Sequence, residues 1–391
     1  MNRKIFVIMA MMMLTLMILP TDGWSAVRGS CSDCHTMHNS QNGSVVAAGG
    51  PYRALTIGEC VACHTGDNDG TNNIPYVMSS AAPTYGPDWS ADGTFTNIGD
   101  TLAGGSFYWV AAAGGIDDAT GHNVSNEGLC GTDGAIGNTP PGFLSGWGTT
   151  GIGADWGSNQ LTCAGTYGCH GDHTYADDFA SVSGGHHGDD SVIDGTTVAK
   201  SYRFLKGILG LEYNTGAQKW EYQPTVAAHN QYKGAYRTEA DTIPTLGAGD
   251  GTTISFFCGS CHSDYHSGVD KVAYSNPIGD DPWLRHPTDY DMGSTLAGSE
   301  YRGYYAADGS TQVTNNYNVI ATVASDSVVS VISSVAFDND TAIVTCLSCH
   351  RAHGSPYSDL LRWDYTKIMA GADAVAGWDN KGCFACHTSK D

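Results

Sequence analysis

The sequence predicts a loop-rich fold with short helices and a minor β-hairpin, in a chain that builds little hydrophobic core of its own. Glycine makes up 51 of the 391 residues, and only 15% of the residues are charged. No long stretch has the apolar period of an amphipathic helix. A short motif, Cys-x-x-Cys-His, recurs along the chain. These observations predict short elements that pack against groups held at the motifs.

The motif occurs at Cys31–His35, Cys60–His64, Cys258–His262, Cys346–His350 and Cys383–His387. Chance would produce about 0.02 matches in a chain of this composition, so the repetition is meaningful. Two thiols three positions apart can reach both vinyl groups of one porphyrin, and the next histidine can bind its iron. The predicted fold class is therefore a multihaem cytochrome c, a loop-rich chain wrapped around stacked haems. The attachment residues are Cys31, Cys34, Cys60, Cys63, Cys258, Cys261, Cys346, Cys349, Cys383 and Cys386.

A sixth covalently attached haem is predicted at Cys163, Cys169 and His170, where five residues separate the cysteines. Glycines in the intervening loop let the backbone bulge outward. Cys130, the thirteenth cysteine, leaves an alternative open: it could form a disulfide with Cys163, so that Cys169 alone holds the haem. Zinc is disfavoured at the cysteine pairs, because zinc sites do not need a histidine after every second cysteine.

Residues 1–26 are predicted to be a signal peptide, because Arg3 and Lys4 precede an apolar run over residues 5–19. That run is short for a membrane span, which disfavours a retained anchor. Residues 27–391 are expected to form a single continuous hexahaem domain, since no strong linker interrupts them. The net charge of −22 argues against nucleic acid and anionic membranes as partners. We expect a secreted or cell-surface protein.

Between the motifs the chain offers few regular elements. Residues 76–160 predict coil with short strands, residues 241–255 a loop, and residues 359–376 a helix before the last motif. The clearest strand signal lies just before Cys346. There, the Val- and Ile-rich residues 327–337, an Asp-Asn-Asp turn and residues 341–345 predict a β-hairpin.

The histidines indicate what binds the far face of each iron. Six of the fifteen are proximal ligands: His35, His64, His170, His262, His350 and His387. The other nine are His38, His122, His173, His186, His187, His229, His266, His286 and His353. Only Met37, Met78, Met292 and Met369 lie beyond the signal peptide, too few to serve six haems. Bis-histidine ligation throughout is therefore predicted, and such haems have lower potentials than His/Met haems.

Four of these histidines follow a proximal histidine by three or four residues: His38, His173, His266 and His353. So short a spacing does not reach the far face of the same haem, but it can reach a neighbouring one. This pattern predicts haems in close succession.

Several strings resemble the OmcS-type hexahaem cytochrome filaments of metal-reducing bacteria. They are Cys31–Ser40, Cys258–His266 with Leu284–Pro287, Val344–His353 and Cys383–Asp391. The middle of the chain is more similar to other exported multihaem cytochromes with a Cys-x5-Cys-His site. Its matching strings are residues 161–170, His186-His187, Ser201–Leu205 and His229–Tyr232.

The resemblance implies a continuous haem stack in which the second histidine of the first motif ligates a haem of the adjoining subunit. At the matching position this role falls on His38, so the chain would be a homopolymer. The ligands within the chain would be His122, His266, His286, His353 and one of His173, His186 and His187. We take His187 as the candidate and leave the other two open.

The sequence therefore predicts an electron-transfer protein, not an enzyme, with six haem c groups that conduct electrons outside the cell. The resemblance implies that the chain does so as a polymerised filament. Its partners would be further copies of the chain, other redox proteins and extracellular acceptors. A monomeric periplasmic or surface electron shuttle is the first alternative. A multihaem reductase is the second, but it needs an open iron position, and spare histidines are plentiful.

Overall fold

The structure is a computed structural model. It describes residues 27, 29–84, 101–111, 119–124, 137–143, 156–235, 249–266, 288–295, 304, 317–337, 341–368 and 382–387. The predicted signal peptide lies outside the described residues, and so do Cys130 and His286.

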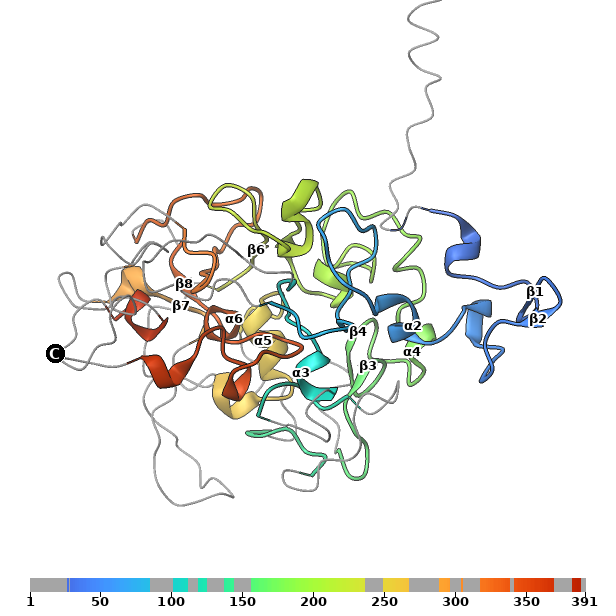
Figure 1. The fold of residues 1–391 in the computed structure, drawn as a ribbon. Coiled ribbons are helices and arrows are strands. Elements are labelled where there is room, and N and C mark those ends of the chain that lie inside the picture. The colour runs from blue at the N-terminus through green and yellow to red at the C-terminus, as the bar shows by residue number, and fades with distance from the viewer. Residues whose placement is uncertain are drawn as a thin grey trace, which may run out of the picture.

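The chain forms a loop-rich body from which the N-terminal arm, residues 29–57, projects at one end (Figure 1). The described C-terminal residues lie toward the opposite end of the body. Between these ends the Cys-His motifs follow one another in chain order, so the sequence of sites runs along the long direction of the molecule. The loop-rich fold class with short helices is confirmed.

Every helix within the described ranges is short. The α-helices are α2 (Cys60–His64), α3 (Tyr108–Ala111), α4 (Asp178–Ser181), α5 (Ile254–Gly259) and α6 (Cys346–Cys349). The 3-10 turns are η1 (Cys31–Asp33), η2 (Arg53–Leu55), η4 (Tyr202–Phe204), η5 (Gly216–Glu221), η6 (Ser263–His266), η7 (Met292–Ser294), η8 (Ser358–Leu360), η9 (Tyr365–Lys367) and η11 (Gly382–Ala385). Several of these short helices carry a motif cysteine, so local helical geometry presents the thiols. In the described part of residues 359–376, two 3-10 turns replace the predicted helix.

The strands form four separate pairs. Strands β1 (Ser40–Gln41) and β2 (Ser44–Val45) pair antiparallel, as do β5 (Gly210–Leu211) with β6 (Gln231–Tyr232) and β7 (Tyr290–Asp291) with β8 (Ile343–Val344). Strands β3 (Thr162–Ala164) and β4 (Gly168–His170) pair parallel. None of these pairs extends into a larger sheet within the described residues.

The predicted hairpin over residues 327–345 is wrong. Residues 327–337 form no strand, and β8 pairs with the distant strand β7 instead. Gln231 accounts for part of the difference, because its side-chain oxygen accepts the backbone N–H of Ile332, 3.2 Å away. The β-branched run therefore packs irregularly: Val335 is fully buried, whereas Val329 is 88% exposed.

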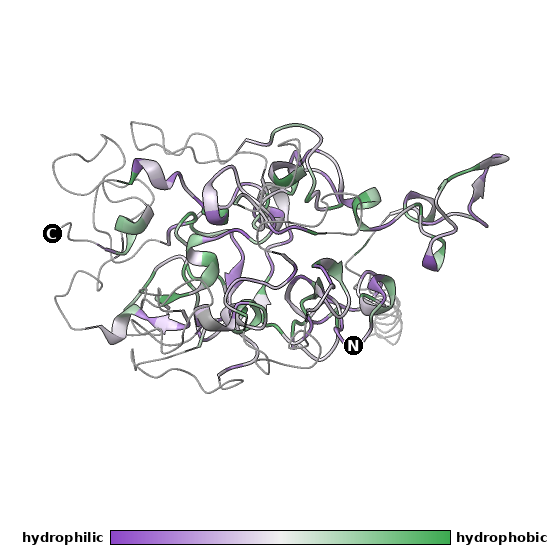
Figure 2. Cartoon of the chain, turned by 90° about the horizontal axis from the view of Figure 1, so that it is seen from below, coloured by the Kyte–Doolittle hydropathy of each residue, from purple (hydrophilic) through white to green (hydrophobic). Residues whose placement is uncertain are grey.

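The buried side chains gather in several small clusters. One contains Tyr202, Leu205, Ile208, Tyr232, Ile254, Ala324 and Ile343, and Cys169 packs against it. A second contains Met292, Tyr304, Tyr317, Val323, Val335, Ala342 and Val344, and Cys386 packs against it. Figure 2 shows the same arrangement as hydrophobic stretches interleaved with hydrophilic ones along the body. A core divided in this way around motif cysteines suits a chain that wraps prosthetic groups.

Val335 and Val329 offer a matched test of this packing. We expect Val335→Ala to reduce the free energy of unfolding by roughly 2 kcal/mol, because it removes two buried methyl groups and leaves a cavity. Val329→Ala should change it by less than about 0.5 kcal/mol, because that side chain is exposed. Chemical unfolding of the purified protein measures both, and equal effects would contradict the burial described here.

Candidate haem centres

Five proximal histidines share one contact, in which the ring Nδ1 lies against a backbone carbonyl oxygen. The pairs are His35 with Ala54 (2.9 Å), His64 with Pro75 (2.8 Å), His170 with Arg203 (2.9 Å), His262 with Pro141 (2.8 Å) and His350 with Asp359 (2.6 Å). A carbonyl only accepts, so Nδ1–H must donate. The neutral ring then presents an unprotonated Nε2, which is the atom that binds a metal.

Four proximal histidines also face a second imidazole. The ring centroids lie 6.1 Å apart for His35 and His187, 6.3 Å for His64 and His186, 6.4 Å for His170 and His353, and 6.0 Å for His262 and His122. Two imidazoles that share one metal through bonds of about 2 Å place their centroids about 6 Å apart. The residues present therefore fit an iron between each pair of rings.

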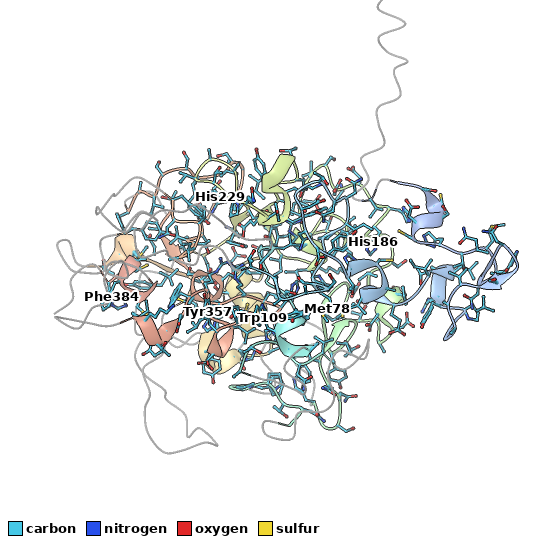
Figure 3. The ribbon with its side chains drawn as sticks, viewed as in Figure 1. Met78, Trp109, His186, His229, Tyr357 and Phe384 are labelled. Atoms are coloured by element: carbon cyan, nitrogen blue, oxygen red, sulfur yellow. The ribbon has the colours of Figure 1, made fainter. Side chains whose placement is uncertain are left out.

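His186 and His187 face two different proximal histidines although they are adjacent in sequence. Figure 3 shows His186 beside α2, which ends at His64. The sequence offered one ligand from His173, His186 and His187, whereas the structure brings two of them to proximal rings. His173 is buried, and its Nε2 lies 3.2 Å from the carbonyl oxygen of Cys169. The doubled histidine itself was the signal for a second site.

Backbone contacts link the segment that carries His122 to the segment that carries His353. The Nδ1 of His122 lies 2.6 Å from the carbonyl oxygen of Ala352, and the backbone N–H of His353 donates to Gly104, 2.6 Å away. A Cβ atom at Gly104 would lie 2.7 Å from the ring of His353. The residue must therefore be a glycine for the imidazole to fit. These contacts bring residues from the first and last thirds of the chain to one site.

Three further predicted ligands differ in their surroundings. His266 is buried, with Nδ1 2.9 Å from the Thr288 hydroxyl and Nε2 3.7 Å from the Asp289 carboxylate. His38 is exposed on the N-terminal arm, in a left-handed backbone conformation with φ of 56°. His286 lies outside the described residues. The structure thus leaves the ligand roles of these three as predictions.

His229, which the sequence left unassigned, is fully buried near the upper surface in Figure 3. Its Nδ1 lies 2.7 Å from the carbonyl oxygen of Asn230, and its Nε2 lies 3.0 Å from that of Ile332. The ring also stacks on Tyr317 at 3.7 Å. Because carbonyl oxygens occupy both ring nitrogens, His229 is not placed to bind iron.

His350 differs from the four paired proximal histidines. Its Nδ1 meets Asp359, but no second imidazole of the described residues lies opposite its ring. The residue as a whole is exposed, although burial lowers the pKa of its imidazole. Any imidazole that faces this ring therefore comes from outside the described part of the chain.

The site of Cys163, Cys169 and His170 is built on the parallel pair of β3 and β4. Cys163 lies on β3 and Cys169 on β4, and the pairing sets Ala164 beside His170. Gly165 turns the loop between them with φ of 94°, where a Cβ atom would lie 2.8 Å from the carbonyl oxygen of Ala176. The five intervening residues are thus folded back, which brings the two cysteines together despite their longer spacing.

Cysteines of successive motifs also meet. The Cys34 and Cys63 thiols hydrogen-bond to one another, and the Cys258 thiol hydrogen-bonds to Cys346. Burial raises the pKa of the Cys349 thiol, and the nearby cysteines of the last motif raise it further. Neighbouring sites are therefore close enough for their attached groups to approach one another.

Burial favours the neutral form of six of the eight facing imidazoles. It lowers the pKa of His186 and of His262 to about 4 and that of His353 to about 3. Burial likewise lowers the pKa of His64, His122 and His170. Neutral imidazole is the form that binds metal, so the electrostatics of these sites suit iron ligation.

Comparisons with known proteins agree with this chemistry. The doubled CXXCH motif family matches residues 341–391. The C-type cytochrome OmcS of Geobacter sulfurreducens is 25% identical over 386 residues, which cover 89% of this chain and 83% of that protein. The motif match and the sequence similarity support covalently bound c-type haem. In the described residues, no helix is long and apolar enough to cross a membrane.

Two solved structures of the Geobacter sulfurreducens protein are also similar. The outer membrane cytochrome S filament is 22% identical with a TM-score of 0.42, and covers 90% of this chain and 88% of its own. The cryo-EM structure of the OmcS nanowires is 16% identical with a TM-score of 0.33, at the same coverage of both chains.

The lowered histidine pKa values predict a pH dependence of stability. The folded pKa values near 4 lie below the ordinary value of 6.5, so only the unfolded chain takes up protons as the pH first falls. We expect the stability contributed by these histidines to be complete above pH 6.5 and lost progressively toward pH 4. Urea unfolding between pH 7 and 5, above the range of ordinary carboxylates, measures this slope. The exposed Val329, which carries no titratable group, provides the control: Val329→Ala should retain the slope, and a flat profile in the unaltered protein would contradict the prediction.

Proposed function

We propose that this chain, an OmcS-type multihaem cytochrome, carries electrons outside the cell through six bis-histidine c-type haems and assembles into a polymer. The observation that carries the proposal is the succession of proximal histidines with facing imidazoles along the body. Haem supplies one-electron redox chemistry of its iron. The chain contributes position, spacing and shielding, and has the role of an electron-transfer protein.

The facing imidazoles support electron transfer over catalysis. In each of the four pairs, a histidine stands on both sides of the space for the iron, so neither axial position would be open to a substrate. The Nδ1 contacts with backbone carbonyls hold the proximal rings in one orientation. Rings held in this way would bind a haem iron in the same orientation in either oxidation state, which would favour electron transfer over the reductase alternative.

The proposed count of six includes the site of Cys163, Cys169 and His170. This site has the same features as the others, namely an Nδ1 contact with a backbone carbonyl and a facing imidazole, here His353. We expect intact-mass analysis of the exported protein to find six haems on a chain that has lost residues 1–26. Cys169→Ala combined with Cys163→Ala should leave five. A count of five in the unaltered protein would contradict the sixth site.

The proposed polymer rests on two complementary features at different places in the molecule. His38 is exposed on the projecting arm, and His350 is an exposed proximal histidine without a facing imidazole in the described residues. A histidine on a projecting arm can reach a neighbouring subunit. We therefore assign His38 of one subunit to the iron at His350 of the next, which would join successive haem chains. The relative's printed description as a filament agrees with this assembly.

His38→Ala tests the assembly. We expect six attached haems per chain, loss or weakening of polymers in electron micrographs, and one high-spin iron per chain that binds carbon monoxide. Met37→Ala is the control, because this neighbouring side chain is 76% exposed and carries no imidazole. Added imidazole should restore the low-spin spectrum of His38→Ala without restoring the polymer, because free imidazole replaces the ligand but not the link.

Two results would change the assignment. Normal polymers of His38→Ala with wholly low-spin haem would remove His38 from the interface. Absence of polymers in the unaltered protein would favour the monomeric shuttle, in which the same haems exchange electrons with other redox proteins or extracellular acceptors. Export is part of the proposal through the signal peptide of residues 1–26, and the net charge of −22 suits a solvated surface.

A further inference from the structure

The carbonyl groups that accept from the proximal histidines belong to conformationally restricted residues. Pro75 and Pro141 have the fixed φ of proline and hold His64 and His262. The other three acceptors are in the left-handed region, with φ of 57° at Ala54, 50° at Arg203 and 59° at Asp359. Thus all five recorded acceptors lie in unusually rigid or strained backbone.

The three left-handed acceptors belong to one repeated turn. The next residue is also left-handed in each case: Leu55 with φ of 55°, Phe204 with 61° and Leu360 with 57°. Its carbonyl accepts the backbone N–H of the residue after the proximal histidine. These bonds are Thr36 to Leu55 (2.6 Å), Gly171 to Phe204 (2.8 Å) and Arg351 to Leu360 (2.8 Å). In each turn, two successive carbonyl oxygens therefore accept hydrogen bonds, one from the proximal histidine ring and one from the backbone N–H of the next residue.

None of these six turn residues is glycine, although glycine is plentiful in the chain. Left-handed backbone is unfavourable for residues with a Cβ atom, and it persists only where the surroundings determine it. Two of the turns share a Pro-Tyr-x-x-Leu string, at residues 51–55 and 356–360, whereas the turn at Arg203 does not. The turns lie 19, 33 and 9 residues after their proximal histidines, so a fixed spacing from the motif does not explain the repetition. The shared feature is the histidine that each turn holds.

Trp220 and Glu221 also form a pair of consecutive left-handed residues, with φ of 56° and 60°, although this pair does not hold a proximal histidine. The carbonyl of Trp220 accepts the backbone N–H of Ala103, 3.1 Å away. Ala103 precedes Gly104, whose carbonyl accepts from the backbone of His353. The same backbone device therefore steadies the loop that holds a facing imidazole.

We propose that the restricted carbonyls are clamps that set the orientation and the donor strength of the proximal imidazoles, with Ala54, Arg203, Asp359, Pro75 and Pro141 as positioning residues. The inference rests on the proposed haem sites and adds to them how each potential is tuned. A Nδ1–H bond to a firmly held acceptor makes the imidazole more basic, which stabilises the oxidised iron and lowers its potential. Loosening a clamp should raise the potential of that haem alone.

Ala54 offers the cleanest test, because it is exposed and its site has the facing pair of His35 and His187. Ala54→Val disfavours the left-handed turn, since a β-branched side chain fits poorly there, whereas Ala54→Gly favours it. We expect spectroelectrochemistry of the haem-loaded protein to show one haem's share of the titration shifted to higher potential in Ala54→Val. Its electron paramagnetic resonance spectrum should show one altered low-spin signal. Ala54→Gly should match the unaltered protein in both.

Asp359 provides a second test if Ala54→Val does not yield haem-loaded protein. Its side chain is exposed, and Asp359→Asn removes the charge but tolerates the left-handed turn, whereas Asp359→Val removes both. If the carbonyl of Asp359 acts as a clamp, the reduction potential of the haem at His350 should be higher in Asp359→Val than in Asp359→Asn. Equal potentials and unchanged spectra within either pair of variants, at full haem content, would overturn the inference. Absence of covalent haem in the unaltered protein would instead overturn the proposed function, so the two failures are distinguishable.

Discussion

The pairing of imidazole rings, whose centroids lie 6.0 to 6.4 Å apart at four proximal histidines, is the constraint on which much of the rest of the structure depends. Each proximal histidine is local to its motif, but the facing partner of each of these four comes from another part of the chain, as His170 and His353 show. The chain must therefore bring distant segments to fixed separations at several places. Short elements joined by irregular loops meet this demand better than long helices, which would commit many residues to one direction.

The same constraint explains how the interior is divided. Buried residues form small clusters against motif cysteines, such as the cluster of Tyr304 and Val335 beside Cys386. At five of the sites a backbone carbonyl lies behind the proximal ring and accepts a hydrogen bond from its Nδ1–H. Burial and hydrogen bonding thus act on the same imidazoles. Together they explain how a glycine-rich chain can hold imidazoles firmly.

The features that could be predicted from the sequence are those encoded in short strings. The attachment motifs and their proximal histidines depend on five consecutive residues, and the recurrence made the fold class and the OmcS-type resemblance accessible. The facing partners could not be assigned in the same way, because His122 and His262 are joined only by the path of the chain. The hairpin prediction failed for the same reason: β8 pairs with β7, a partner that alternation in residues 327–345 does not encode.

The adjacent histidines His186 and His187 have a mechanical consequence. Consecutive Cα atoms are about 3.8 Å apart, so the two imidazoles cannot move independently over any large distance. His186 faces His64 in the body, and His187 faces His35 on the arm. A single dipeptide therefore contacts both the arm and the body. The exposed ion pair of Arg53 and Asp177 adds little to that joint. If the molecule bends within an assembly, the sites of His35 and His64 will move together as one rigid unit. Other parts of the chain will then change conformation.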